Sequence, residues 1–268
     1  MNRDHFCARV AVFIPVILAL GLAGCASGGA RGSHSKVSVS ASQDRAPAEI
    51  QGLVKKWGDQ YKRRPNDKGA ALNYAAALRL NGQNSQAVAV LRRAVIAHKS
   101  DRDVASAYGK ALASNGQFKE ALTVIRNANP PANPDWRLLS AEGALLDQIG
   151  DNTSARVKYQ EALKIAPDEP SILSNMALSH VLTNDLVRAE QILRRAAASP
   201  NANSKVRQNL ALVLGLQGKF KEAEAVANNE LSREQAAANM AYLRSMLKQP
   251  NTWDRIKAQD KEKKKQRG

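Results

Sequence analysis

The chain has 268 residues and carries 40 lysine and arginine residues against 24 aspartate and glutamate residues, a formal charge of +16. Only 4% of the residues are aromatic, which argues against a surface that stacks nucleic-acid bases. The chain has two cysteines, too few for a fold held together by a disulfide framework.

The first 24 residues have the pattern of an export signal. Arg3 and Arg9 give a basic start, and residues 10–22 form an apolar run that is too short to span a bilayer. Leu22-Ala23-Gly24 then precedes Cys25. This order resembles the lipobox of bacterial lipoproteins, which implies cleavage before Cys25 and acylation of its thiol and its new amino group. An ordinary signal peptide followed by an incidental cysteine is the alternative.

Residues 25–46 would then be the lipidated cysteine and a flexible tether. They are rich in serine, glycine and alanine, and a chain of this length and composition reaches roughly 25 Å. In lipoproteins an aspartate after the cysteine retains the protein in the inner membrane. Ala26 stands there instead, which implies the periplasmic face of the outer membrane. Because Cys7 would leave with the signal, the mature chain could form no internal disulfide.

Five positions spaced 34 residues apart hold glycine or asparagine, and an alanine follows each of them five residues later. The five positions are Gly82, Gly116, Gly150, Asn184 and Gly218. This period resembles tetratricopeptide repeats, which are stacked pairs of antiparallel helices. The resemblance implies an all-α fold, an α-solenoid of about five helix pairs. The five expected repeats are 68–101, 102–135, 136–169, 170–203 and 204–237, and places are counted from the first residue of each.

Three further places support this register. Places 8, 20 and 27 hold glycine or alanine in every repeat except at Glu230, and small side chains let helices cross closely. Place 11 holds leucine except at His180, and Glu142 stands where the other repeats have tyrosine, methionine or leucine. We therefore expect the second helix of repeat five to be the loosest.

Both ends of the stack should carry an extra helix. Trp57 and Tyr61 precede Pro65 at helical spacing, which predicts an orphan N-terminal helix over residues 47–64. A closing helix is predicted over residues 233–248, with Met240, Leu243, Met246 and Leu247 on its apolar face. The repeat domain would cover residues 47–249. Residues 250–268 form a basic tail that should be disordered, because its run from Lys261 to Arg267 has no apolar face.

The first helices of such repeats line an inner groove that binds peptides in related families. Place 6 holds an asparagine in three repeats, and an amide can both donate to and accept from a peptide backbone. We predict a partner-binding groove that includes Asn73, Lys110, Asn175, Lys205 and Asn209. The alternative is that asparagine recurs there only because of local helix-turn preferences.

The sequence does not indicate an enzyme, a cofactor or a metal site. Of the four histidines, His5 lies in the signal, His34 in the tether, His98 near a helix end and His180 in the core column at place 11. A histidine in that column is expected to be structural. No glycine-rich phosphate loop follows a predicted strand. Because the export signal argues against nucleic acid, the positive charge favours acidic proteins, anionic lipid head groups or weak binding to anionic envelope polymers; solubility alone is the alternative.

A lipobox, a tether, about five tetratricopeptide repeats and a basic tail together resemble the TadD family of tight-adherence (Flp) pilus assembly lipoproteins. The resemblance implies a pilotin-like scaffold at the outer membrane, with a secretin or another pilus-assembly subunit as its partner. Two other roles remain open. One is an accessory lipoprotein of outer-membrane protein insertion, type IV pilus assembly or polysaccharide export. The other is a cell-wall-associated regulator.

Overall fold

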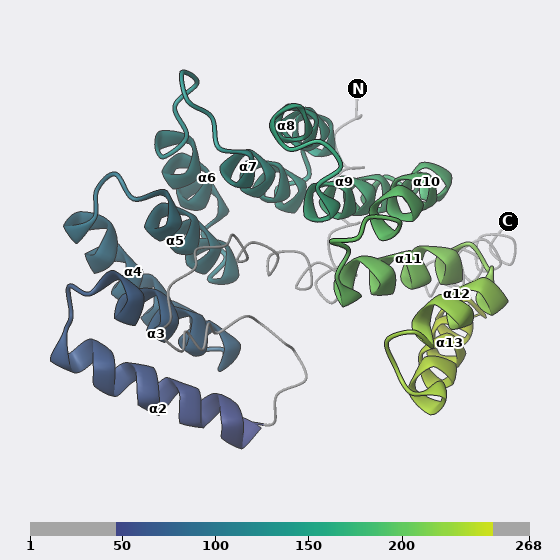
Figure 1. The fold of residues 1–268 in the computed structure, drawn as a ribbon, viewed down its shortest axis with the longest axis horizontal. Helices are drawn as coiled ribbons and strands as arrows, with labels where there is room; N and C mark the ends of the chain where they lie inside the picture. The colour runs from purple at the N-terminus through teal and green to yellow at the C-terminus, as the bar shows by residue number, and fades with distance from the viewer. Residues whose placement is uncertain (1–46, 249–268) are drawn as a thin grey trace, which may run out of the picture. The chain divides into compact units, whose positions relative to one another are not determined.

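The computed structural model describes residues 47–248, and every regular element in that range is an α-helix (Figure 1). The predicted signal peptide, the lipid attachment at Cys25, the tether and the basic tail lie outside the described residues. The twelve helices of the described range are α2 (Pro47–Arg63), α3 (Lys68–Leu80), α4 (Asn84–Ala97), α5 (Arg102–Ser114), α6 (Phe118–Asn127), α7 (Trp136–Gln148), α8 (Asn152–Ile165), α9 (Pro170–Leu182), α10 (Leu186–Ala197), α11 (Ser204–Leu216), α12 (Phe220–Ala227) and α13 (Arg233–Lys248).

The helices follow the 34-residue period of the sequence. The first helix of each pair (α3, α5, α7, α9 and α11) is 13 residues long and begins at the first place of its repeat. Every second helix (α4, α6, α8, α10 and α12) begins at place 17. The prediction of five helix pairs, with α2 before them and α13 after them, is confirmed.

The turn inside each pair explains the column of glycine and asparagine. Gly82, Gly116, Gly150, Asn184 and Gly218 all have positive φ, between 60° and 87°. In each repeat the N–H of the next residue donates to the C=O of place 11 at 2.8–2.9 Å. This is the Schellman arrangement, which satisfies a carbonyl at the helix end and requires a left-handed residue. Asparagine tolerates that conformation better than other non-glycine residues do.

The start of each first helix is capped by the residue that immediately precedes it. These residues are Asp67, Asp101, Asp135, Glu169 and Asn203, and each side chain accepts a hydrogen bond from an N–H of the first turn. Such a cap contributes about 1 kcal/mol to helix stability. The sequence reading missed this column, although its signal is present, because a capping side chain recurs there every 34 residues.

The chain divides into two compact bodies. The N-terminal body holds α2 to α8, up to Pro167, and the C-terminal body holds α9 to α13, from Asp168. Inside each body the first helices of neighbouring pairs pack on one another: α3 on α5, α5 on α7, and α9 on α11. Each body is therefore a stack of helix pairs whose first helices are in mutual contact.

Small residues lie where the helices cross, as predicted. The alanines at place 20 (Ala87, Ala121, Ala155, Ala189 and Ala223) are all 0% exposed. The two glycines at place 8 face large side chains of the second helix. A Cβ added to Gly109 would lie 2.7 Å from Ile125 Cδ1, and one added to Gly143 would lie 2.7 Å from Tyr159 Cε1. Only a residue without a side chain fits against these partners.

The three departures from the repeat pattern each have a polar partner. Glu142 is 5% exposed, and its carboxylate accepts a hydrogen bond from Arg126 Nε at 2.8 Å. His180 is 6% exposed, with Nδ1 lying 3.2 Å from the carboxylate of Asp185, the N-cap of α10.

The third departure, Glu230, lies beyond the end of α12 and pairs with Arg207. With eight residues, α12 is the shortest of the second helices. That the second helix of repeat five is also the loosest stays a prediction.

The terminal helices close the apolar ends. Tyr61 of α2 stacks near Tyr74 of α3, with ring centroids 5.5 Å apart, and Val54 packs on the same core. In α13, Met240 and Leu243 are buried. Without α2 and α13, the apolar faces of α3 and α12 would contact water.

Candidate partner-binding surface

Side-chain hydrogen bonds with a constant sequence separation join α3 to α5 and α9 to α11. Each of three bonds links residues that are 35 positions apart on neighbouring first helices. Lys68 Nζ donates to Asp103 Oδ2 at 2.8 Å, Arg79 Nε to Ser114 Oγ at 3.1 Å, and Asn209 Nδ2 to Ser174 Oγ at 2.8 Å. Of the residues in these three bonds, Asn209 belongs to the predicted groove. This face is therefore fixed in geometry by contacts within the protein.

In the N-terminal body, two predicted groove residues lie on adjacent helices. Asn73 of α3 is half-buried, and its Nδ2 donates to the backbone oxygen of Gly69 at 2.8 Å, one turn earlier in the same helix. Lys110 of α5 is half-buried as well. Because α3 packs on α5, the structure places both side chains in the same layer of first helices.

In the C-terminal body, the structure changes the expectation for Asn209. The residue is 5% exposed, and its amide is engaged with Ser174, which is buried too. Asn209 is thus a contact inside the fold that locks α11 to α9, and not an exposed groove side chain. Serine recurs at place 5 in three repeats (Ser106, Ser140 and Ser174), a signal that the sequence reading did not use.

Asn175 and Lys205 lie near this contact. Asn175 follows Ser174 on α9, and Lys205 lies one helical turn before Asn209 on α11, so the two α11 side chains share a face. Both residues are half-buried. Burial lowers the pKa of Lys205 to about 8. The part played by Asn73, Lys110, Asn175 and Lys205 in binding a partner stays a prediction.

The most strongly perturbed carboxylate of the described range is structural. Glu190 of α10 accepts hydrogen bonds from Lys219 at 2.6 Å, Gln217 at 2.9 Å and Arg194 at 2.9 Å. The hydrogen bond from Lys219 is the main reason that the pKa of Glu190 falls to about 2. Lys219 and Gln217 tie α10 to the turn between α11 and α12, whereas Arg194 lies on α10 itself. The low pKa of Glu190 therefore reflects packing of the repeats.

Residues 47–248 hold no group of three or more His, Cys, Asp or Glu side chains placed to bind a metal ion. Across the same range, no helix combines the length and the apolar character that a membrane crossing needs. His180 lies in the core beside Asp185, as a structural residue would.

Comparison with known proteins supports the fold. No family model matches the chain. A solved tetratricopeptide repeat protein from Parabacteroides merdae superposes with a TM-score of 0.62 over 73% of this chain and 78% of that one, at 10% identity. One chain of the APC/C hetero-tetramer Cut9-Hcn1 gives a TM-score of 0.57 at 14% identity, covering 75% of this chain and 40% of that one.

In sequence, the chain is 33% identical over 121 residues to the human protein O-mannosyl-transferase TMTC1. The match covers 44% of this chain and only 14% of the human protein, so the transferase name says nothing about the activity of this chain. The structural likeness is to helical-repeat proteins, which is the architecture seen here. By fold, the chain is a tetratricopeptide-like helical-repeat protein.

Proposed function

We propose that this protein is a non-enzymatic lipoprotein that is anchored in the outer membrane and that assembles an envelope machine by binding its subunits. The observation that carries the proposal is the combination of a stack of helix pairs with the Leu22-Ala23-Gly24-Cys25 sequence in front of it. A stack of this kind offers an extended surface for proteins. Several acyl chains on one cysteine give firm membrane anchoring.

The machine that fits best is a tight-adherence (Flp) pilus, with the protein acting as a pilotin-like scaffold of the TadD type for an outer-membrane secretin. Support comes from the order of lipobox, tether, repeats and basic tail. In each body, hydrogen bonds between neighbouring first helices (α3 with α5, and α9 with α11) would help to preorganise the surface, which lowers the entropy cost of binding a partner.

The anchor is tested by Cys25→Ser in the native host. We expect the substituted protein to lose incorporation of labelled palmitate and to move from the outer-membrane fraction to the soluble periplasmic fraction, while circular dichroism shows unchanged helix content. Retention of Cys25→Ser in the outer membrane would refute anchoring through this residue.

The partner surface is tested by charge reversal at Lys110 and Lys205, one in each body. A matched control reverses the exposed Lys119, which lies on a second helix. We expect Lys110→Glu and Lys205→Glu to reduce crosslinking to the secretin, whereas Lys119→Glu leaves it intact. Equal crosslinking by all three variants would place the partner elsewhere on the protein.

The formal charge of +16 favours one alternative, a cell-wall-associated regulator held by the anionic envelope polymer. Binding of the purified protein to isolated sacculi that persists in moderate salt would support this role, as would a normal pilus in a strain that lacks the gene.

A further inference from the structure

The exposed face of α2 carries a cluster of cations and has a net positive charge. The helix packs on α3 through Val54 and Tyr61, and the opposite face contacts water. Four cations lie on that exposed face: Lys55, Lys56, Lys62 and Arg63. Within the described residues none of the four forms an ion pair.

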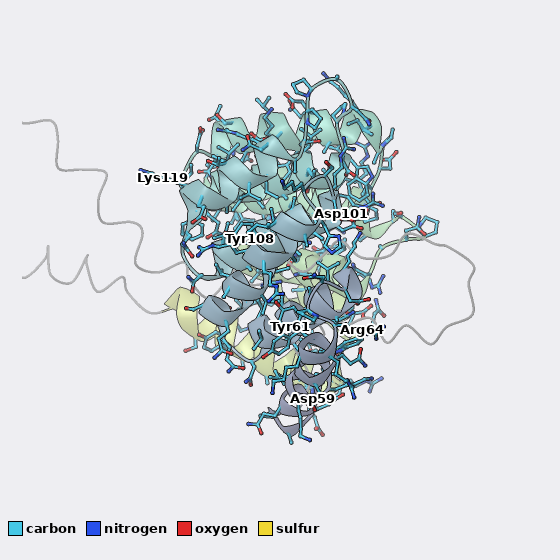
Figure 2. The ribbon with its side chains drawn as sticks, turned by 90° about the vertical axis from the view of Figure 1, so that its left-hand side faces the viewer. Asp59, Tyr61, Arg64, Asp101, Tyr108 and Lys119 are labelled. Atoms are coloured by element: carbon cyan, nitrogen blue, oxygen red, sulfur yellow. The ribbon has the colours of Figure 1, made fainter. Side chains whose placement is uncertain are left out.

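Favourable interaction with the helix dipole explains only part of this charge. Lys62 and Arg63 lie in the last turn of α2, where a cation stabilises the helix end. Lys55 and Lys56 lie two turns earlier, beyond the reach of that effect. Two exposed acidic residues share the face: Asp59 lies among the cations, and Glu49 lies in the first turn of the helix. Figure 2 shows Asp59 together with Arg64, the exposed cation that follows the helix.

The position of α2 in the chain indicates what this face meets. Residues 26–46 alone separate Pro47, the first residue of α2, from Cys25. A flexible chain of that length has a root-mean-square end-to-end distance of roughly 25 Å, so the proposed anchor at Cys25 would keep the helix near the membrane. No aromatic side chain is exposed on the face, so it lacks the stacking groups of a nucleic-acid site.

We propose that the basic face of α2 lies against anionic phospholipid head groups and orients the N-terminal body on the membrane that holds the anchor. The inference rests on the proposed lipid anchor for its location, but the contact itself is electrostatic and does not need the acyl chains. Each lysine near an anionic bilayer strengthens binding roughly fivefold, so three of them account for about a hundredfold.

The test uses the mature chain with Cys25→Ser, which removes the acyl chains and so separates the face from the anchor. Binding to phosphatidylcholine vesicles is measured with and without phosphatidylglycerol, at low and at raised salt. We expect binding only to the anionic vesicles, and weakening as salt screens the charges.

Charge reversal then identifies the face. The triple variant Lys55→Glu, Lys56→Glu and Lys62→Glu should bind at least tenfold more weakly than a control with the same change in net charge. That control reverses three exposed lysines on other helices, Lys119, Lys164 and Lys221. Figure 2 shows Lys119 well apart from Asp59 and Arg64. Equal losses in the two variants would overturn the proposal.

Two further measurements distinguish a loss of lipid binding from misfolding of the triple variant. Asp59→Asn removes the one anion from the centre of the face and should tighten binding a few-fold, which a folding defect would not do. A Cβ at Gly52, on the same face, would meet nothing within 4 Å, so Gly52→Cys accepts a fluorescent label. We expect a lipid-borne quencher to quench a label at position 52 and not one at position 119.

The basic tail is the competing source of lipid binding. Replacing Lys261, Lys263 and Lys264 with glutamine should leave most of the binding in place. If this variant loses the binding while the α2 variant keeps it, the tail is the membrane contact and the proposal falls. If Cys25 is lipidated but the α2 substitutions do not change vesicle binding, the proposed membrane contact of α2 is refuted and the proposed anchor stands. If α2 mediates vesicle binding but Cys25 is not lipidated in the host, the proposed anchor is refuted and the membrane contact of α2 stands.

Discussion

Gly143→Ala tests the close packing of the repeats most directly. Gly143 lies in the middle of α7, where alanine would normally stabilise a helix by about 0.5–1 kcal/mol. Here the added Cβ would lie 2.7 Å from Tyr159 Cε1, 2.9 Å from Cζ and 3.0 Å from Cδ1. The whole edge of the ring would have to move for the methyl group to fit.

The ring has little freedom to move. Tyr159 is 1% exposed, and its hydroxyl donates to Asp147 Oδ2 at 2.9 Å. Overpacking of a core by one methyl group costs about 1–3 kcal/mol, and displacement of the ring would also weaken the bond to Asp147 by about 1 kcal/mol. After subtraction of the helix gain, we expect Gly143→Ala to lower the free energy of unfolding by about 1–3 kcal/mol.

Urea unfolding followed by circular dichroism measures this loss, with a midpoint shift of about 1 M for 2 kcal/mol. Gly109→Ala is a graded control, because its Cβ would meet Cδ1 and Cγ1 of Ile125, an aliphatic side chain that no hydrogen bond holds in place. Gly52→Ala is the control without a clash, because its Cβ would meet nothing within 4 Å. It should raise the free energy of unfolding by about 0.5–1 kcal/mol. If Gly143→Ala lowers the free energy of unfolding by no more than Gly109→Ala does, the role assigned to the hydrogen-bonded ring of Tyr159 is refuted.

A second substitution tests the mechanism. Repeats one and four combine alanine and leucine at these two places, in Ala75 with Leu91 and Ala177 with Leu193. Tyr159→Leu should therefore reduce the cost of Gly143→Ala, with a coupling energy of about 1–2 kcal/mol in the double-mutant cycle. Simple additivity would show that the two side chains do not compete for the same space.

Three further predictions concern turns, a buried pair and acid stability. Asn184→Gly should raise stability by about 0.5–1 kcal/mol in thermal unfolding, because Asn184 has a φ of 60°. Arg126→Met should lower the free energy of unfolding in urea by about 1–3 kcal/mol, because it leaves the buried Glu142 carboxylate without its cationic partner. Adding Glu142→Met should restore most of this loss. The carboxylate of Glu190 has a pKa of about 2 against an ordinary 4.5, so it stabilises the fold above pH 4.5 and loses that contribution as pH falls towards 2. Glu190→Gln should therefore flatten the change in urea midpoint over this pH range.

Much of the fold could be read from the sequence because each pair of helices obeys local rules. Gly82 and its four counterparts marked the turns, since a left-handed residue is needed wherever the first helix ends in a Schellman turn. The capping column at Asp67 and Asp101 was equally local and could have been found in the same way. The resemblance of Leu22-Ala23-Gly24-Cys25 to a lipobox is likewise a local signal, from which the anchor is proposed.

The tertiary structure decided which polar side chains are available to a partner. Asn73 and Asn209 occupy the same place in their repeats, yet Asn73 bonds within its own helix while Asn209 is buried against Ser174. Sequence periodicity assigns both residues to one column, but exposure depends on the neighbouring helix, which differs from repeat to repeat. The same holds for Gly143. The position requires glycine because the ring of Tyr159 packs against it, and only the packing of α7 on α8 creates that contact.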